Sequence, residues 1–181
     1  FGSACEAWVL DADRWRDEIR WALHVERRFL MHNMSYDLLV LDRHGFRAVD
    51  SLGPGVTDTY ILAHLLDPRA KSEGGSGLGL KDLAQIHIDP AAPDGQTELV
   101  KVFRSMGETK ETGWAVVPID NETYVRYAGL DVVFTARLFE SLWPMVEGAD
   151  LDDLTAMTGR FVTREQELFC EVLLFLFCLD Y

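Results

Sequence analysis

The stretch FLMHNMSYDLLVLDRHG, residues 29–45, guides the interpretation of the whole chain. Its first residues are apolar and strand-like, and residues 35–44 predict a helix that ends at Gly45. Asp37 lies near the start of this helix, directly before the apolar run LLVL. A carboxylate beside so much apolar surface costs free energy unless another group compensates its charge. The stretch therefore raises the question of which group pairs with Asp37.

A second polar pair lies in YAGLD, residues 127–131. Tyr127 and Asp131 are four residues apart in a predicted helix, so their side chains share one face, with Cβ atoms about 5–6 Å apart. A tyrosine hydroxyl beside a metal-bound carboxylate can orient a water molecule for attack on a phosphodiester. Taken alone, such a pair is more often an ordinary feature of a helix surface, and an isolated Asp37 is more often a carboxylate at a helix N-terminus. Only their combination, order and spacing indicate catalysis.

The composition limits the function classes. The chain has 181 residues, 48% of them hydrophobic, and a formal net charge of −13. This charge argues against phosphate binding by Lys and Arg alone, but it agrees with a nuclease in which carboxylates recruit divalent cations that meet the phosphate. The three cysteines are too few and too scattered for a disulfide framework or a zinc site, which favours a reducing compartment. No apolar run reaches the roughly 20 residues of a membrane-spanning helix.

The periodicity of apolar residues predicts short strands followed by helices. Strands are expected at 5–10 and 28–33, and Asp11 or Asp13 is expected to cap the next helix. The other expected elements are a helix from Thr57 to Leu66, a loop at 69–77, a helix at 78–88, a loop at 89–96, a helix at 97–105, one or two helices at 121–143 and a long helix from Leu154. This order predicts an α/β fold.

In this order, HNMSYD (32–37) and YAGLD resemble the second and third motifs of the DEDDy 3′–5′ exonucleases. More narrowly, they resemble the proofreading domain of family A, polymerase-I-type DNA polymerases in the form carried by actinobacteriophages. The segments TDTYILAHLLDPR, GGSGLGLKDLA, APDGQ and GW…PID…TYVRYAGLDVVFTARL follow in the order of that family, so the resemblance covers residues 1–143. It implies a ribonuclease H-like (DnaQ-like) α/β fold with a mixed sheet flanked by helices.

The resemblance also implies roles for individual residues. It makes Asp37 and Asp131 metal ligands, Tyr127 the residue that positions the attacking water, and Asn33 a contact near the bound 3′ end. The implied cofactors are two divalent ions, Mg²⁺ or Mn²⁺, with Zn²⁺ as a third option. The implied reaction is hydrolysis of the 3′-terminal phosphodiester of DNA, which releases a nucleoside monophosphate. Metal ions would then be the partners of Asp37.

The first motif of this family, Asp-x-Glu, precedes the point at which this chain begins. Residues 1–146 are therefore expected to form an exonuclease domain that lacks its N-terminal strands, and residues 147–181 to lead to the thumb-like region of a polymerase. The sequence Asp120-Asn121-Glu122 is in the wrong place in the order, and Asp120 is instead expected to cap a helix. This chain alone is expected to bind metals weakly and to be nearly inactive, and a parent that carries the first motif to be active.

Two alternatives remain open at this point: a ribonuclease D-like RNA exonuclease and an inactive exonuclease-fold scaffold. The expected partners are the 3′ end of single-stranded DNA and a polymerase domain in the same parent chain, with no membrane. The expected state is a monomer in the cytoplasm of a phage host. His32 is expected to have its hydrogen bonds satisfied and not to act as a catalyst. The tryptophans expected in the core or at an interface are Trp15, Trp21, Trp114 and Trp143. One of them, or Phe103, could stack on a base.

Overall fold

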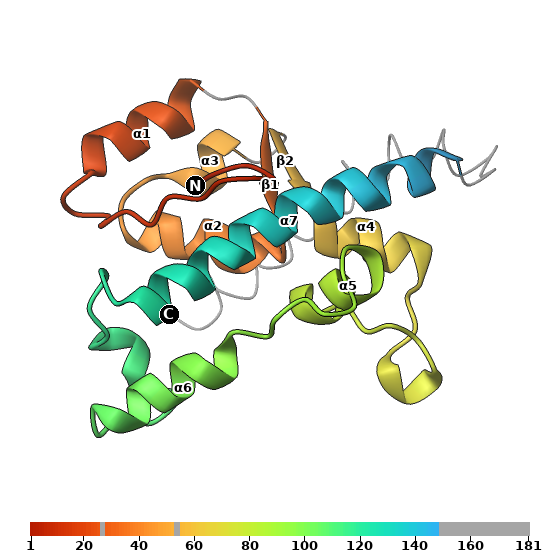
Figure 1. The fold of residues 1–181 in the computed structure, drawn as a ribbon. Coiled ribbons are helices and arrows are strands. Elements are labelled where there is room, and N and C mark those ends of the chain that lie inside the picture. The colour runs from red at the N-terminus through yellow and green to blue at the C-terminus, as the bar shows by residue number, and fades with distance from the viewer. Residues whose placement is uncertain (26–27, 53–54, 149–181) are drawn as a thin grey trace, which may run out of the picture.

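The computed structural model describes residues 1–25, 28–52 and 55–148 (Figure 1). Its elements are, in chain order, α1 (Arg16–Val25), β1 (Phe29–Met31), α2 (Met34–Arg43), α3 (Ala48–Leu52), β2 (Val56–Asp58), α4 (Thr59–Leu66), η2 (Lys71–Glu73), α5 (Leu80–His87), α6 (Gln96–Ser105), η3 (Gly113–Ala115) and α7 (Glu122–Gly148). Helix α7 runs across the molecule and packs against α4, α5, α6 and β1 (Figure 1). The arrangement confirms the predicted α/β class.

The sheet of the described residues consists of the two parallel strands β1 and β2, with Phe29 opposite Val56 and Met31 opposite Asp58. Parallel strands need a crossover, which α2 and α3 supply. Both strands therefore end at the same edge. The strand predicted at 28–33 is confirmed in a shorter form. Strand β2 was not predicted, since its last two residues were assigned to a helix starting at Thr57, and this helix begins only at Thr59.

Asp58 decides where β2 ends and where two helices begin. Its side chain is buried and accepts hydrogen bonds of 2.9 Å from the backbone N–H groups of Asn33, Met34 and Tyr60. These are N-terminal donors that a helix leaves unsatisfied, so one carboxylate caps both α2 and α4. Asn33 adopts the left-handed conformation, with φ 64° and ψ 56°, at the sharp turn from β1 into α2.

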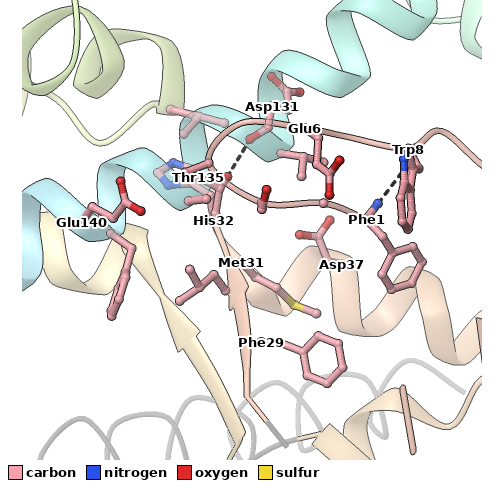
Figure 2. A pocket seen from close by; sticks show the side chains of 18 of the residues that line it. Phe1, Glu6, Trp8, Phe29, Met31, His32, Asp37, Asp131, Thr135 and Glu140 are labelled. Atoms are coloured by element: carbon pink, nitrogen blue, oxygen red, sulfur yellow. Dashed lines mark hydrogen bonds between the residues drawn. The ribbon is translucent and has the colours of Figure 1, made fainter. Parts of the chain in front are cut away.

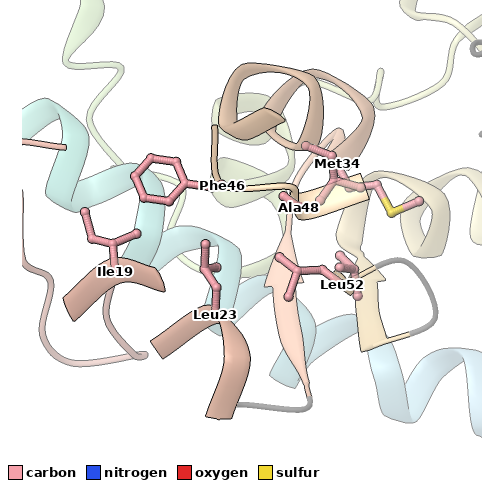
Figure 3. Close-up of a cluster of buried hydrophobic side chains, with 8 residues drawn as sticks. Ile19, Leu23, Met34, Phe46, Ala48 and Leu52 are labelled. Atoms are coloured by element: carbon pink, nitrogen blue, oxygen red, sulfur yellow. The ribbon is translucent and has the colours of Figure 1, made fainter. Parts of the chain in front are cut away.

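One hydrophobic cluster joins α1 to the sheet and its crossover (Figure 3). Helix α1 contributes Ile19 and Leu23, four residues apart on one face, to this cluster. Asp11 is the capping residue, since its Oδ1 accepts from the N–H groups of Asp13 and Arg14 at 3.0 and 2.8 Å. The other buried members are Met34, Leu38, Phe46, Ala48, Leu52 and Val56.

A second cluster packs α4 and α5 against α7 through Leu62, Leu83, Leu138 and other apolar residues. Farther along, α6 and η3 pack on each other, and a side chain at Gly113 would place its Cβ 2.1 Å from Cγ of Phe103. Phe103 is completely buried, which makes it a core residue and excludes it from base stacking in this arrangement.

Several expectations differ from the structure. Residues 5–10 form no strand, because residues 1–8 fold back on themselves, with an isolated antiparallel bridge between Gly2 and Ala7. The cap of α7 is Asn121, whose Oδ1 accepts from the N–H of Tyr124 at 3.1 Å, and not Asp120. Helix α7 is continuous from Glu122 to Gly148. The linker after Gly148 and the helix from Leu154 lie outside the described residues.

None of the helices that the structure describes has both the length and the apolar character that crossing a membrane requires.

Candidate active site

A pocket of about 1100 Å³ opens between the N-terminal segment, β1, α2, α5 and α7 (Figure 2). Asp37, Tyr127 and Asp131 all line it, although Asp37 is 94 residues away from Asp131 in the chain (131 − 37). Asn33 does not line it: its side chain is exposed, and its backbone N–H is bound to Asp58. The fold thus brings together three of the four predicted site residues.

Asp37 enters the pocket from the first turn of α2. Among the described residues, no hydrogen-bond donor and no cation contacts its carboxylate. Burial raises the pKa of Asp37 to about 6, and the nearby negative charge of Asp58 acts in the same direction. No group of the described residues therefore pairs with Asp37. Its carboxylate favours a cation that does not belong to these residues.

Asp131 has a partner, because the ammonium of Lys81 on α5 forms an ion pair with its carboxylate. The side chain of Lys81 is 20% exposed and that of Asp131 is 35% exposed. Burial lowers the pKa of Lys81 to about 8, and the opposite charge of Asp94 acts against this decrease. Sequence reasoning missed Lys81, although it lies within the motif-like segment GGSGLGLKDLA.

Tyr127 lies one turn before Asp131 on α7, as its spacing predicted. Lys81 Nζ is 4.9 Å from the centroid of its ring, and the ring of Trp114 is 5.7 Å away, centroid to centroid. On another side, a Cβ at Gly95 would lie 3.2 Å from Cδ2 of Tyr127. Burial raises the pKa of Tyr127, so its hydroxyl keeps its proton at neutral pH and can donate a hydrogen bond.

His32 also borders the pocket, and its two ring nitrogens are both engaged. Nδ1 lies 2.9 Å from Oγ1 of Thr59, and Nε2 lies 3.0 Å from the carbonyl oxygen of Leu78. Burial is the main cause that lowers its pKa, which favours the neutral imidazole. The expectation of a satisfied histidine at this position is confirmed.

Two further carboxylates line the pocket, those of Glu6 and Glu140 (Figure 2). Sequence reasoning missed both, because neither has a neighbouring motif residue. Nevertheless, within the described part of the chain no three His, Cys, Asp or Glu side chains come close enough together to hold a metal ion. Arg28 and Lys81 bring cationic side chains to the pocket lining, so both signs of charge are present.

The comparisons with known proteins agree with this geometry. A family model described as 3′–5′ exonuclease matches residues 23–147. A DNA polymerase of Mycobacterium phage D29 is 38% identical over 151 residues, and one of Mycobacterium phage L5 is 35% identical over 150 residues. Each match covers 81% of this chain but 25% of the relative, so the chain spans about a quarter of the length of the curated relatives it matches.

No solved structure matches the chain. The family match is nevertheless decisive, because it extends from the end of α1 into the last turn of α7 and includes all four predicted site residues. The chain belongs to the 3′–5′ exonuclease family and has its α/β, ribonuclease H-like fold.

Proposed function

We propose that this chain is the proofreading 3′–5′ exonuclease domain of a bacteriophage DNA polymerase and acts on the 3′ end of single-stranded DNA. The observation that carries the proposal is the convergence of Asp37, Tyr127 and Asp131 on one pocket. Both phage relatives are named DNA polymerases, which supports a polymerase domain in the same parent chain. Neither is named a ribonuclease, so the ribonuclease D-like alternative has no support.

The donor set fits a hard divalent cation. Two carboxylates line one pocket, and that of Asp37 lacks a partner among the described residues. Oxygen ligands of this kind suit Mg²⁺ and Mn²⁺. We infer that Asp37 and Asp131 hold such ions, which when bound polarise the phosphodiester and lower the pKa of the attacking water.

Residues around the pocket would then have separate roles in the proposed hydrolysis. Tyr127 carries a protonated hydroxyl on the face of α7 that also carries Asp131, so it can orient the attacking water. Lys81 and Arg28 supply positive charge at the pocket, which favours approach of the phosphate in a strongly acidic chain. The predicted contact of Asn33 with the 3′ end stays a prediction.

The number of ligands bears on activity. Two carboxylates hold a metal pair more weakly than four, and within the described residues no third ligand joins them. We infer that strong metal binding needs the Asp-x-Glu motif of the family, which a parent polymerase would contribute. The chain of 181 residues alone is then expected to cleave slowly.

The test uses the parent polymerase and a single-stranded DNA oligonucleotide labelled at its 5′ end. Replacing Asp131→Ala is expected to abolish 3′-end trimming in the presence of Mg²⁺ while polymerisation continues. Asp120→Ala is the matched control, because this exposed aspartate belongs to the rejected Asp-x-Glu sequence and should leave trimming unchanged. Trimming that persists in Asp131→Ala would contradict the metal-ligand role. Faster trimming of an RNA oligonucleotide by the unmodified polymerase would favour the ribonuclease reading.

A further inference from the structure

Lys81 touches two of the three proposed catalytic groups. From the first turn of α5 it crosses to α7, where its ammonium pairs with the carboxylate of Asp131. The same nitrogen lies 4.9 Å from the ring centroid of Tyr127 and 5.2 Å from that of Phe134. A cation over two aromatic faces and against a carboxylate is held by several attractions at once. These contacts therefore fix the position of the Lys81 ammonium between Asp131, Tyr127 and Phe134.

The burial of Lys81 distinguishes it from the other lysines that pair with acids. Its side chain is 20% exposed, whereas those of Lys71 and Lys101 are 61% and 63% exposed. An exposed pair contributes little, whereas removing one partner of a partly buried pair leaves a charge without full compensation and is more unfavourable. Lys81 can therefore leave Asp131 at low cost only when another cation takes its place.

We propose that Lys81 is the cation of Asp131 in the metal-free domain and that a divalent ion binds there by replacing it. The inference rests on the proposed metal role of Asp131. A carboxylate that binds Mg²⁺ or Mn²⁺ directly cannot keep the same lone pairs on an ammonium. The flexible four-carbon stem of Lys81 allows its nitrogen to move aside within the pocket.

Asp37 provides an internal contrast. Its carboxylate has no cation among the described residues, so an ion that binds there displaces nothing. The exchange is thus a property of the α7 side of the pocket. Its consequence is that Lys81 lowers the affinity of Asp131 for metal, while it keeps this carboxylate compensated before the metal arrives.

The test is a Mn²⁺ titration of the 181-residue chain, followed by the electron paramagnetic resonance signal of free Mn²⁺. Lys81→Met keeps most of the apolar stem and removes the charge. Lys101→Met is the matched control, because it removes a lysine that also pairs with an acid, Glu98, outside the pocket lining. Both variants therefore change the net charge of the chain by the same amount. We expect Lys81→Met to bind Mn²⁺ about three- to tenfold more tightly than Lys101→Met.

A second readout is thermal unfolding. Without metal, Lys81→Met should lower Tm, and Lys81→Met combined with Asp131→Asn should lower it by less than the sum of the single changes. Saturating Mn²⁺ should remove the decrease caused by Lys81→Met.

The outcomes separate this inference from the proposed function. Suppose that Lys81→Met binds Mn²⁺ no more tightly than Lys101→Met, while Asp131→Asn weakens binding. The proposed replacement of Lys81 by a metal ion is then wrong, and the metal-ligand role of Asp131 stands. If Asp131→Asn leaves Mn²⁺ binding unchanged in both the wild-type and the Lys81→Met background, the metal role fails, and the exchange fails with it.

Discussion

Two sides of the pocket each carry one motif aspartate: the α2 wall carries Asp37, and the α7 wall carries Asp131. The two carboxylates differ in whether a cation lies against them. Asp37 on α2 has no cation among the described residues and lies near the negative charge of Asp58. Asp131 on α7 has the ammonium of Lys81 directly against it. The residue type is the same, the pocket is the same, and both carboxylates are partly buried. The neighbours that the fold supplies therefore decide which of the two carboxylates has a cationic partner.

The difference shows what an incoming cation would do at each wall. At Asp37 it would relieve an uncompensated charge, and at Asp131 it would take the place of an existing partner. Substitutions on each side of the pocket test this difference.

The strongest test of the α7 wall is Tyr127→Phe in the parent polymerase. Loss of the hydroxyl that orients the attacking water is expected to lower the rate of 3′-end trimming by about 10²–10⁴-fold. Tyr124→Phe, one turn earlier on α7 and outside the pocket lining, is the matched control and should trim normally. Single-turnover kinetics measure both rates. Equal rates for the two variants would remove Tyr127 from the mechanism.

On the α2 wall, Asp58→Ala is expected to lower the free energy of unfolding by about 2–4 kcal/mol. The change leaves three backbone N–H groups without their acceptor, at the starts of α2 and α4. Urea unfolding measures the effect. The exposed Asp50→Ala should change stability by less than about 0.5 kcal/mol. If Asp58→Ala were equally mild, this carboxylate would not be what holds the α2 wall in place.

Asp37→Asn tests the electrostatic state of the same wall through pH. The pKa of Asp37 is raised to about 6, so the folded state holds this proton more tightly than the unfolded chain does. Its contribution to stability is complete below the ordinary pKa near 3.8 and is lost as pH rises through 6. The stability of Asp37→Asn relative to wild type should therefore increase between pH 4 and pH 7, by about 1–2 kcal/mol after allowance for solvent screening.

Urea unfolding at the two pH values without divalent ions measures this change, and Mn²⁺ should reduce it by stabilising the wild-type carboxylate. A relative stability that stays constant or falls with pH would show that Asp37 has a compensating partner, and the contrast between the two walls would disappear.

The smallest effect is expected for Asn33→Gly. Glycine adopts the left-handed conformation at φ 64° without penalty, so stability should change by less than about 0.5 kcal/mol, whereas Asn33→Val should cost about 1–2 kcal/mol. If Asn33 also contacts the 3′ end, the glycine variant of the parent polymerase should show a higher KM for DNA at unchanged stability. An unchanged KM would limit the role of Asn33 to the backbone turn from β1 into α2.

The amino-acid sequence by itself determined the features that depend on neighbours along the chain. The helical periods of α1, α2, α5 and α6 are visible in it, and so is the spacing that puts Tyr127 and Asp131 on one face of α7. Helix formation depends on interactions three and four residues apart, which is why these predictions held. The order of strand-like and helix-like segments predicted the α/β class, and the two motifs with the segments between them indicated the family.

Only the tertiary structure decided the rest. Strand β2 is three residues long and directly precedes a helix, so it has no period of its own and exists through its pairing with β1. The cap that Asp58 provides to α2 spans 25 residues of chain, and the ion pair between Lys81 and Asp131 spans 50. Such contacts depend on how distant segments pack in space. They therefore determine which motif carboxylate has a partner and which one lacks it.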